Sequence, residues 1–344
     1  MLPEKTVPPA SAVTVQDIYL ARRRIASIAR RTPLVYSPVL AERAGASVYL
    51  KLENWQETGS FKMRGAANKM LSLTPEEKER GVIAVSTGNH GRAVACVAGQ
   101  LGMRAVVCIS ERVPANKVEA MRRLGAEVVV GGQTYDEAEA YSLRLQEERG
   151  LTRIHPFDDL LVVAGQGTIG LELLEDLPEI DAVVVPLSGG GLIAGIALAL
   201  KAANPATRVI GVSMERAPVM VHSLRVGRPI EMAEEQTLAD ALAGGIGLDN
   251  RYTFPLVQRL VDEVVLVSEE EIAGAMAFAL AEHHMVVEGG GAVGIAAVLH
   301  GKVGRVGRHV AVVVSGGNVN LPVLLEVAQN WTAWPQPSVK TATS

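Results

Sequence analysis

Short apolar runs alternate with helix-like segments over most of this sequence, and no other feature restricts the fold as much. Short apolar runs between turn residues are typical of strands that are buried on both faces. Such runs occupy residues 82–85, 105–109, 127–130, 181–187, 209–212, 263–267 and 310–315. Helical patterns are expected at residues 92–101, 116–124, 135–148 and 192–203. The alternation predicts an α/β protein whose parallel sheets are flanked by helices.

The alternation falls into two sets, with breaks near Thr58 and Asp158. We therefore predict a large domain from residues 1–57 and 159–330, and a small domain from residues 58–158, with a ligand cleft between them. A first helix is expected to begin at the capping pattern Thr14–Asp17 and to end at Thr32-Pro33. The tail at 331–344 is expected to be frayed.

Composition limits the partners and the location of the protein. The formal charge of −4 gives no reason to expect nucleic acid or an anionic membrane as a partner. A cluster of arginines near the N-terminus, without interleaved aromatic residues, is interpreted as a solvated helix face. Two cysteines are too few for a disulfide framework or a structural zinc site. No signal peptide or membrane span is evident, so we expect a cytoplasmic protein.

Two motifs in the first half of the chain carry reactive or anion-binding groups. Residues 60–66 place Lys62 beside Phe61 at a helix start, where desolvation would favour the neutral, nucleophilic amine. A lysine there is otherwise an ordinary surface charge. Residues 86–91 connect a strand to a helix, and the free N–H groups of a helix start can bind a carboxylate. A plain turn would use the same residue types.

Two further motifs follow strands in the second half. Ser188 precedes three consecutive glycines, whose backbone amides can close around a phosphate at a helix start. Three successive glycines exceed what one tight turn requires. Ser315 follows the last predicted strand, where a hydroxyl can reach a ligand in the cleft.

These four motifs, in this order, resemble those of fold type II pyridoxal 5′-phosphate (PLP) enzymes, the tryptophan synthase β-subunit superfamily. Within it the chain resembles the threonine dehydratase and serine racemase branch, and most closely the hydroxyectoine-utilisation dehydratases. The resemblance runs from about residue 18 to about residue 322 and includes residues 51–54, 165–168, 245–248 and 288–290. It implies a two-domain fold with PLP bound by the large domain, in the cleft between the domains.

The resemblance also assigns cofactor contacts. Lys62 would hold PLP covalently and would act as the base that removes the Cα proton. Phe61 would pack against the cofactor ring, Asn89 would donate to its 3′-oxygen, and Ser315 would lie at the pyridine nitrogen. The phosphate would be bound by Ser188, Gly189, Gly190, Gly191 and Leu192.

The substrate carboxylate would be surrounded by Ser86, Thr87, Asn89 and His90. Ser86 and Thr87 would also serve catalysis, because serine racemases carry a second serine at the position of Thr87. A threonine there, with Phe157 where asparagine is common in racemases, makes efficient racemisation less favourable. No metal site is expected, since Ser213 and Val219 stand where that branch carries carboxylates. The roles of Arg92 and Glu288 stay open at this point.

The implied reaction is a β-elimination. A serine cannot keep the pyridine nitrogen protonated as a carboxylate would, so the electron sink is weaker and loss of a β-leaving group is favoured. We therefore predict a PLP-dependent dehydratase that converts a small β-hydroxy amino acid, such as threonine or serine, into a 2-oxo acid and ammonia. A 3-hydroxyaspartate dehydratase and a serine racemase are the alternatives. The resemblance also implies a homo-oligomer, a dimer or tetramer.

Three interpretations compete with this one. Residues 165–170 match the G-x-G-x-x-G dinucleotide pattern, which would indicate an NAD-dependent oxidoreductase. The acidic residue expected about 20 positions later is missing, because Val185-Pro186 stands there. A binding protein that kept the fold without the chemistry, and a β-replacement enzyme like the cysteine synthases, fit the four motifs less well.

Overall fold

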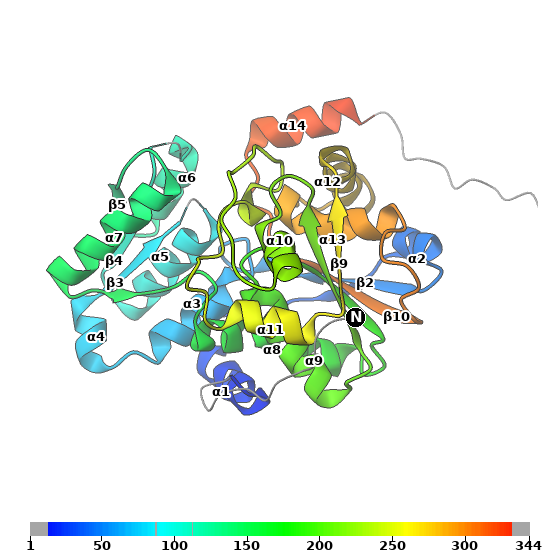
Figure 1. The fold of residues 1–344 in the computed structure, drawn as a ribbon, viewed down its shortest axis with the longest axis horizontal. Coiled ribbons are helices and arrows are strands. Elements are labelled where there is room, and N and C mark those ends of the chain that lie inside the picture. The colour runs from blue at the N-terminus through cyan, green and yellow to red at the C-terminus, as the bar shows by residue number, and fades with distance from the viewer. Residues whose placement is uncertain (1–12, 87, 112, 332–344) are drawn as a thin grey trace, which may run out of the picture.

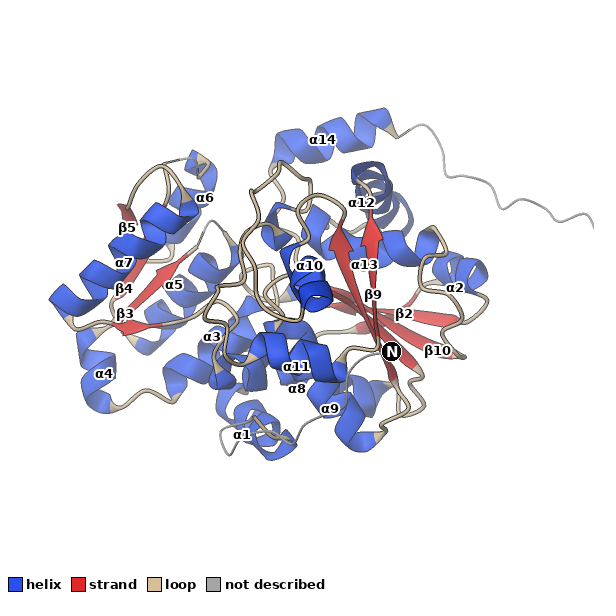
Figure 2. Ribbon diagram, in the orientation of Figure 1, coloured by secondary structure: helices blue, strands red, loops and turns tan. Residues whose placement is uncertain are grey.

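The computed structural model describes residues 13–86, 88–111 and 113–331. Two sheets organise this part of the chain (Figures 1 and 2). The larger sheet has the order β1-β2-β10-β7-β8-β9, and the smaller one the order β5-β4-β3-β6. The strands are β1 (Leu34–Tyr36), β2 (Ser47–Leu52), β3 (Val82–Val85), β4 (Ala105–Ile109), β5 (Glu127–Val130), β6 (Thr152–Arg153), β7 (Ala182–Pro186), β8 (Arg208–Met214), β9 (Glu263–Val267) and β10 (His309–Val314).

The predicted parallel α/β class is confirmed. Only β1 runs antiparallel to its neighbour among the strands that the structure describes, and every other pair is parallel. The predicted strands β3, β4, β5 and β9 agree with the structure at both ends, whereas β7, β8 and β10 differ by one or two residues at their ends. The strands β1, β2 and β6 were not predicted from the sequence.

Helices cover both sheets. Their bounds are α1 (Val15–Ile25), α2 (Pro38–Ala44), α3 (Lys62–Leu71), α4 (Pro75–Arg80), α5 (Asn89–Leu101), α6 (Ala115–Arg123), α7 (Tyr135–Arg149), α8 (Leu160–Asp176), α9 (Gly191–Ala203), α10 (Val219–Val226), α11 (Thr253–Leu260), α12 (Glu269–His283), α13 (Gly289–Leu299) and α14 (Leu321–Asn330). Two short 3-10 helices are η1 (Glu53–Trp55) and η2 (Asp240–Leu242).

Each face of a sheet takes alternate side chains from its strands, as a pleated backbone requires. In β10, Val310, Val312 and Val314 pack with α12 and α13, whereas Ala311 and Val313 pack with α8 and α9 on the other face. The smaller sheet is divided in the same way between α5 on one face and α7 on the other. Burial on both faces explains why these strands are nearly continuous apolar runs.

The first helix is shorter than predicted. The capping box of Thr14 and Asp17 is present, but α1 ends at Ile25. The following residues form a turn in which the amide of Gln56 bonds the backbone N–H and C=O of Arg30, at 3.0 and 2.8 Å. Arg22 pairs with Glu175, so at least one of the clustered arginines has an intramolecular partner.

The G-x-G-x-x-G run is the middle of helix α8, not a turn between a strand and a helix. Its glycines allow helices to approach closely. An ideal Cβ on Gly165 would lie 2.6 Å from the carbonyl oxygen of Arg64 in α3, and one on Gly195 in α9 would lie 2.6 Å from the backbone nitrogen of Gly167. The run therefore serves helix packing, and the dinucleotide interpretation is rejected.

Both cysteines, Cys96 and Cys108, are buried and unpaired, as expected of small core residues. Within the described ranges, no helix is long and apolar enough to cross a membrane.

Candidate active site

Loops that follow three strands bring the four motifs together. Residue 86 follows β3, residue 188 lies just after β7, and residue 315 follows β10. The backbone N–H of Phe61 donates to the carbonyl of Ser315 at 3.0 Å. The side chain of Asn318 donates from Nδ2 to Oδ1 of Asn89 at 2.6 Å. The carboxyl ends of parallel strands are where α/β proteins bind ligands.

Lys62 is the first residue of α3, and its side chain is half-buried. Its Nζ donates to the carbonyl oxygen of Pro156 at 2.7 Å and lies 5.2 Å from the centre of the Phe61 ring. Burial lowers the pKa of Lys62 from its ordinary value of 10.5 to about 8. Such an amine is far more often neutral near pH 7 than a surface lysine is, and the neutral form is the nucleophile and the base.

The glycine loop forms the beginning of α9. Gly190 is the N-cap, has a φ of 87°, and offers no side chain to the free N–H groups of the first turn. Those donors and the helix dipole together suit an anion. Phe157 lines the loop so closely that a Cβ on Gly189 would overlap its ring. Only glycine leaves this backbone open, and the loop therefore fits a phosphate group.

Ser315 is buried at the end of β10, and its hydroxyl lies 3.5 Å from the carbonyl oxygen of Gly290. That distance is too long for a strong hydrogen bond, so the hydroxyl is available to a ligand. Ser86 is also buried, and its Oγ accepts from the backbone N–H of Gly88 at 3.1 Å. Thr87 lies outside the described residues.

His90 was predicted to lie at the substrate carboxylate, and the structure shows its ring bonded to the backbone. Its Nε2 lies 2.8 Å from the carbonyl oxygen of Ile154, which can only accept, so Nε2 carries the proton. Burial, with a contribution from the nearby Lys62 charge, lowers the pKa of His90 to about 3. The imidazole is therefore neutral and its Nδ1 is an acceptor. A carboxylate bound here would find donors in the backbone N–H groups at the start of α5 rather than in this ring.

Two further residues contact Asn89: Glu288, whose role was left open, and Asn318, for which no role was predicted. Glu288 accepts from Asn89 Nδ2 at 2.6 Å, and Asn318 bonds the other end of the same amide. Asn318 lies three residues after Ser315, and Glu288 precedes the glycines that begin α13, so both lie beside recognised motifs. What the sequence did not contain was their spatial relationship to Asn89.

Arg92 lines a cavity that also reaches Asn318. Its Nη1 donates to Oδ1 of Asn318 at 2.6 Å. It lines a space of about 570 Å³ that is also bordered by Thr58, Cys96 and Asn116. Neither Lys62 nor the glycine loop is among the described residues that border this space. Arg92 therefore contacts the candidate site through Asn318, which bonds Asn89.

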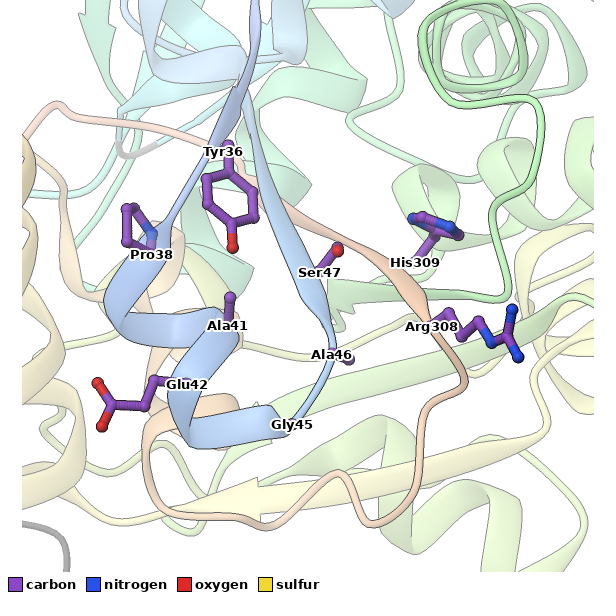
Figure 3. Close-up of a pocket in the computed structure, with 9 residues that line it drawn as sticks. All are labelled: Tyr36, Pro38, Ala41, Glu42, Gly45, Ala46, Ser47, Arg308 and His309. Atoms are coloured by element: carbon purple, nitrogen blue, oxygen red, sulfur yellow. The ribbon is translucent and has the colours of Figure 1, made fainter.

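A second hollow, of about 610 Å³, lies at the end of the larger sheet where β2 and β10 begin (Figure 3). Tyr36, Pro38, Ser47 and His309 line it, and the last two begin β2 and β10. Ser315 follows the other end of β10, so this hollow is remote from the four motifs.

The half-buried Lys62 amine fits the aldehyde of PLP, the glycine-rich helix start fits its phosphate, and the strand-end hydroxyl fits its ring nitrogen. Fold and site thus define the class of fold type II PLP-dependent enzymes. The sequence family described as "Pyridoxal-phosphate dependent enzyme" matches residues 25–316, and the chain belongs to this family. The predicted class, a PLP-dependent lyase of the threonine dehydratase and serine racemase type, is confirmed.

Relatives with known names agree with this membership. The chain is 47% identical to an L-threonine ammonia-lyase from Thermotoga maritima over 312 residues, which are 91% of this chain and 77% of that one. It is similar to maize serine racemase, with a TM-score of 0.87 and 37% identity, over 92% of this chain and 96% of that one. Threonine deaminase isoform 2 from Solanum lycopersicum gives a TM-score of 0.84 and 36% identity, over 96% and 99%.

Proposed function

We propose that the protein is a PLP-dependent ammonia-lyase that eliminates water from L-threonine, and from L-serine, to release a 2-oxo acid and ammonia. The observation that carries the proposal is the Lys62 amine, which bonds the carbonyl oxygen of Pro156 beside the Phe61 ring and has its pKa lowered to about 8. The name of the Thermotoga maritima relative supports threonine as the first substrate to test.

When bound, PLP supplies an electron sink for the charge that develops on the substrate Cα. The Nζ of Lys62 would hold the cofactor and would move the Cα proton. Backbone N–H groups of residues 188–192 would bind the phosphate. The Ser315 hydroxyl would lie at the ring nitrogen without supplying a charge, which would favour loss of the β-hydroxyl. Substrate binding falls to Ser86, Thr87, Asn89 and the backbone around His90.

The alternatives differ in what they demand of the site. A 3-hydroxyaspartate dehydratase needs a cation for the second carboxylate, but the Arg92 guanidinium is already bonded to Asn318. A serine racemase is favoured by the similarity to the maize enzyme. Phe157 and Thr87 count against it, as does the higher identity to the threonine ammonia-lyase. The relation to hydroxyectoine utilisation stays a prediction that the substrate panel below will test.

We further propose that residues 58–158 form the small domain and that residues 1–57 and 159–330 form the large one. All strands of the smaller sheet come from residues 82–153, which supports this division. A homo-oligomer, dimer or tetramer, that acts in the cytoplasm completes the proposal.

The test is a visible absorption spectrum of the purified protein, followed by addition of L-threonine, L-serine, 3-hydroxyaspartate and amino acids derived from hydroxyectoine. We expect a band of bound PLP, with 2-oxo acid and ammonia released fastest from threonine. Lys62→Ala should abolish both. Lys69→Ala, which changes a lysine on the same helix that pairs with Asp159, should keep them. A wild-type protein that binds no PLP would overturn the proposal, and D-serine formation without 2-oxo acid would establish a racemase.

A further inference from the structure

Glu288 is the N-cap residue of α13, yet its side chain makes no capping hydrogen bond to its own helix. It is buried, and it turns instead to Asn89 at the start of α5. An acidic residue at a helix start normally needs no further explanation, because the helix dipole favours it. A buried carboxylate that points to a residue of the candidate site does need one.

The contacts fix the orientation of the Asn89 amide. Glu288 Oε1 accepts from Asn89 Nδ2 at 2.6 Å, and Asn89 Oδ1 accepts from Asn318 Nδ2 at 2.6 Å. A flipped amide would place its oxygen against the carboxylate and its NH₂ group against another NH₂ group. An amide nitrogen has two donors, and the second N–H of Nδ2 has no acceptor among the described residues, so it can serve a ligand.

The backbone is shaped around this carboxylate. A Cβ on Gly316 would overlap Glu288 Oε1, so the residue after Ser315 has no room for a side chain. Glu288 Oε2 accepts from the backbone N–H of Asn318 at 3.1 Å. Both oxygens are acceptors in these bonds, which suits the ionised carboxylate. If either oxygen were protonated, its O–H would point at an N–H donor, or the hydrogen bond from that donor would be lost.

We propose that Glu288 is a positioning residue that directs the free N–H of Asn89 to the 3′-oxygen of PLP, and that its charge controls the ionisation of that oxygen. The inference rests on the proposed contact between Asn89 and PLP. An ionised carboxylate one amide away disfavours negative charge on the 3′-oxygen, because like charges repel strongly where water is excluded.

Several charged groups surround Glu288 and affect its titration. Asp240 of η2 faces it, as do Lys117 of α6 and Arg92 of α5. Lys117 and Asp240 pair with each other at 2.6 Å. Burial, and then the Asp240 charge, raise the pKa of Glu288 to about 7. The carboxyl group therefore loses its negative charge as the pH falls through about 7, and the hold on Asn89 weakens.

The experiment compares the PLP-loaded wild type with Glu288→Gln and Asp240→Asn, without substrate. The absorption band of the bound cofactor is titrated with pH, and PLP affinity is measured by reconstitution. We expect a spectral step near the pKa of Glu288 in the wild type. Glu288→Gln should lose this step and bind PLP about tenfold more weakly. Asp240→Asn should keep the step and move it to lower pH, because one negative neighbour is removed.

Asp240→Asn guards against a folding artefact, since the Asp240 side chain is 56% exposed and asparagine keeps its shape while removing its charge. A wild type that binds PLP, with the same spectral titration and affinity in Glu288→Gln, would overturn the inference and leave the proposed function intact. An unmoved step in Asp240→Asn would also overturn it. A wild type without a PLP band would overturn the proposed function first.

Discussion

The Arg64 guanidinium binds both oxygens of the Glu53 carboxylate, with Nε 2.8 Å from Oε2 and Nη2 2.8 Å from Oε1. Both side chains are buried, and Glu172 of α8 accepts from the same guanidinium at 2.6 Å. Arg64 follows Lys62 by two residues on α3. The ion cluster therefore fixes the helix that carries the reactive amine to η1 and to α8.

Removing the guanidinium leaves two buried carboxylates with too few partners. Arg64→Ala is expected to lower the free energy of unfolding by about 3–5 kcal/mol, as for other broken buried ion pairs. Urea unfolding measures the change. Arg123→Ala is the matched control, because its ion pair with Glu119 is exposed and should contribute less than about 1 kcal/mol. Equal urea midpoints for the two variants would contradict the role of the cluster.

Lys62 is expected to destabilise the cofactor-free protein. Its pKa is about 8 when folded and 10.5 otherwise, so the unfolded chain binds the proton more tightly. The penalty is complete below pH 8 and fades as the pH rises towards 10.5. Cofactor-free Lys62→Met should then be more stable at pH 7 by up to about 3 kcal/mol, with the gain shrinking at high pH. Urea unfolding at both pH values checks this; a gain that does not change with pH would refute it.

Gly189 and Phe157 should be coupled in cofactor binding. A methyl group at Gly189 would overlap the Phe157 ring, and relief would push the loop away from the phosphate. We expect Gly189→Ala to weaken PLP binding by about tenfold or more, in line with the cost of overpacking. The double variant with Phe157→Ala should recover part of that loss in a reconstitution titration. Additive losses would show that the two residues act independently.

The helix crossing at Gly195 should be intolerant of any side chain. A Cβ there would lie 2.6 Å from the backbone nitrogen of Gly167, which cannot move as a flexible side chain can. Gly195→Ala is expected to cost about 1–3 kcal/mol in urea unfolding. Gly274→Ala on α12 is the control, since open space surrounds that position and alanine should stabilise the helix by about 0.5–1 kcal/mol.

The parallel fold could be predicted because its strands are buried on both faces and therefore read as apolar runs. The edge strands β1 and β6 could not, because one has two exposed side chains and the other only two residues. The first helix was predicted to be longer than α1 because the residues near Arg30 do not indicate that Gln56, distant in sequence, binds the backbone there.

The motifs of the site could be recognised locally, since a lysine beside a helix start and a glycine run each have a distinct chemistry. Contacts between residues that are distant in the sequence could not be predicted from these motifs. The sequence gives no sign that Ile154 holds the His90 ring, or that Glu288 and Asn318 fix the Asn89 amide. Such contacts join residues whose proximity is created only by the sheet order.

Because β10 lies between β2 and β7, the larger sheet can be completed only late in the synthesis of the chain. All strands of the smaller sheet have left the ribosome once residue 153 has emerged, whereas the larger sheet lacks a central strand until residue 314 does. During that interval β2 and β7 have no shared neighbour, and their edges are open to wrong pairing. The nascent chain therefore completes the candidate site at Ser315 only after every other described strand has been made.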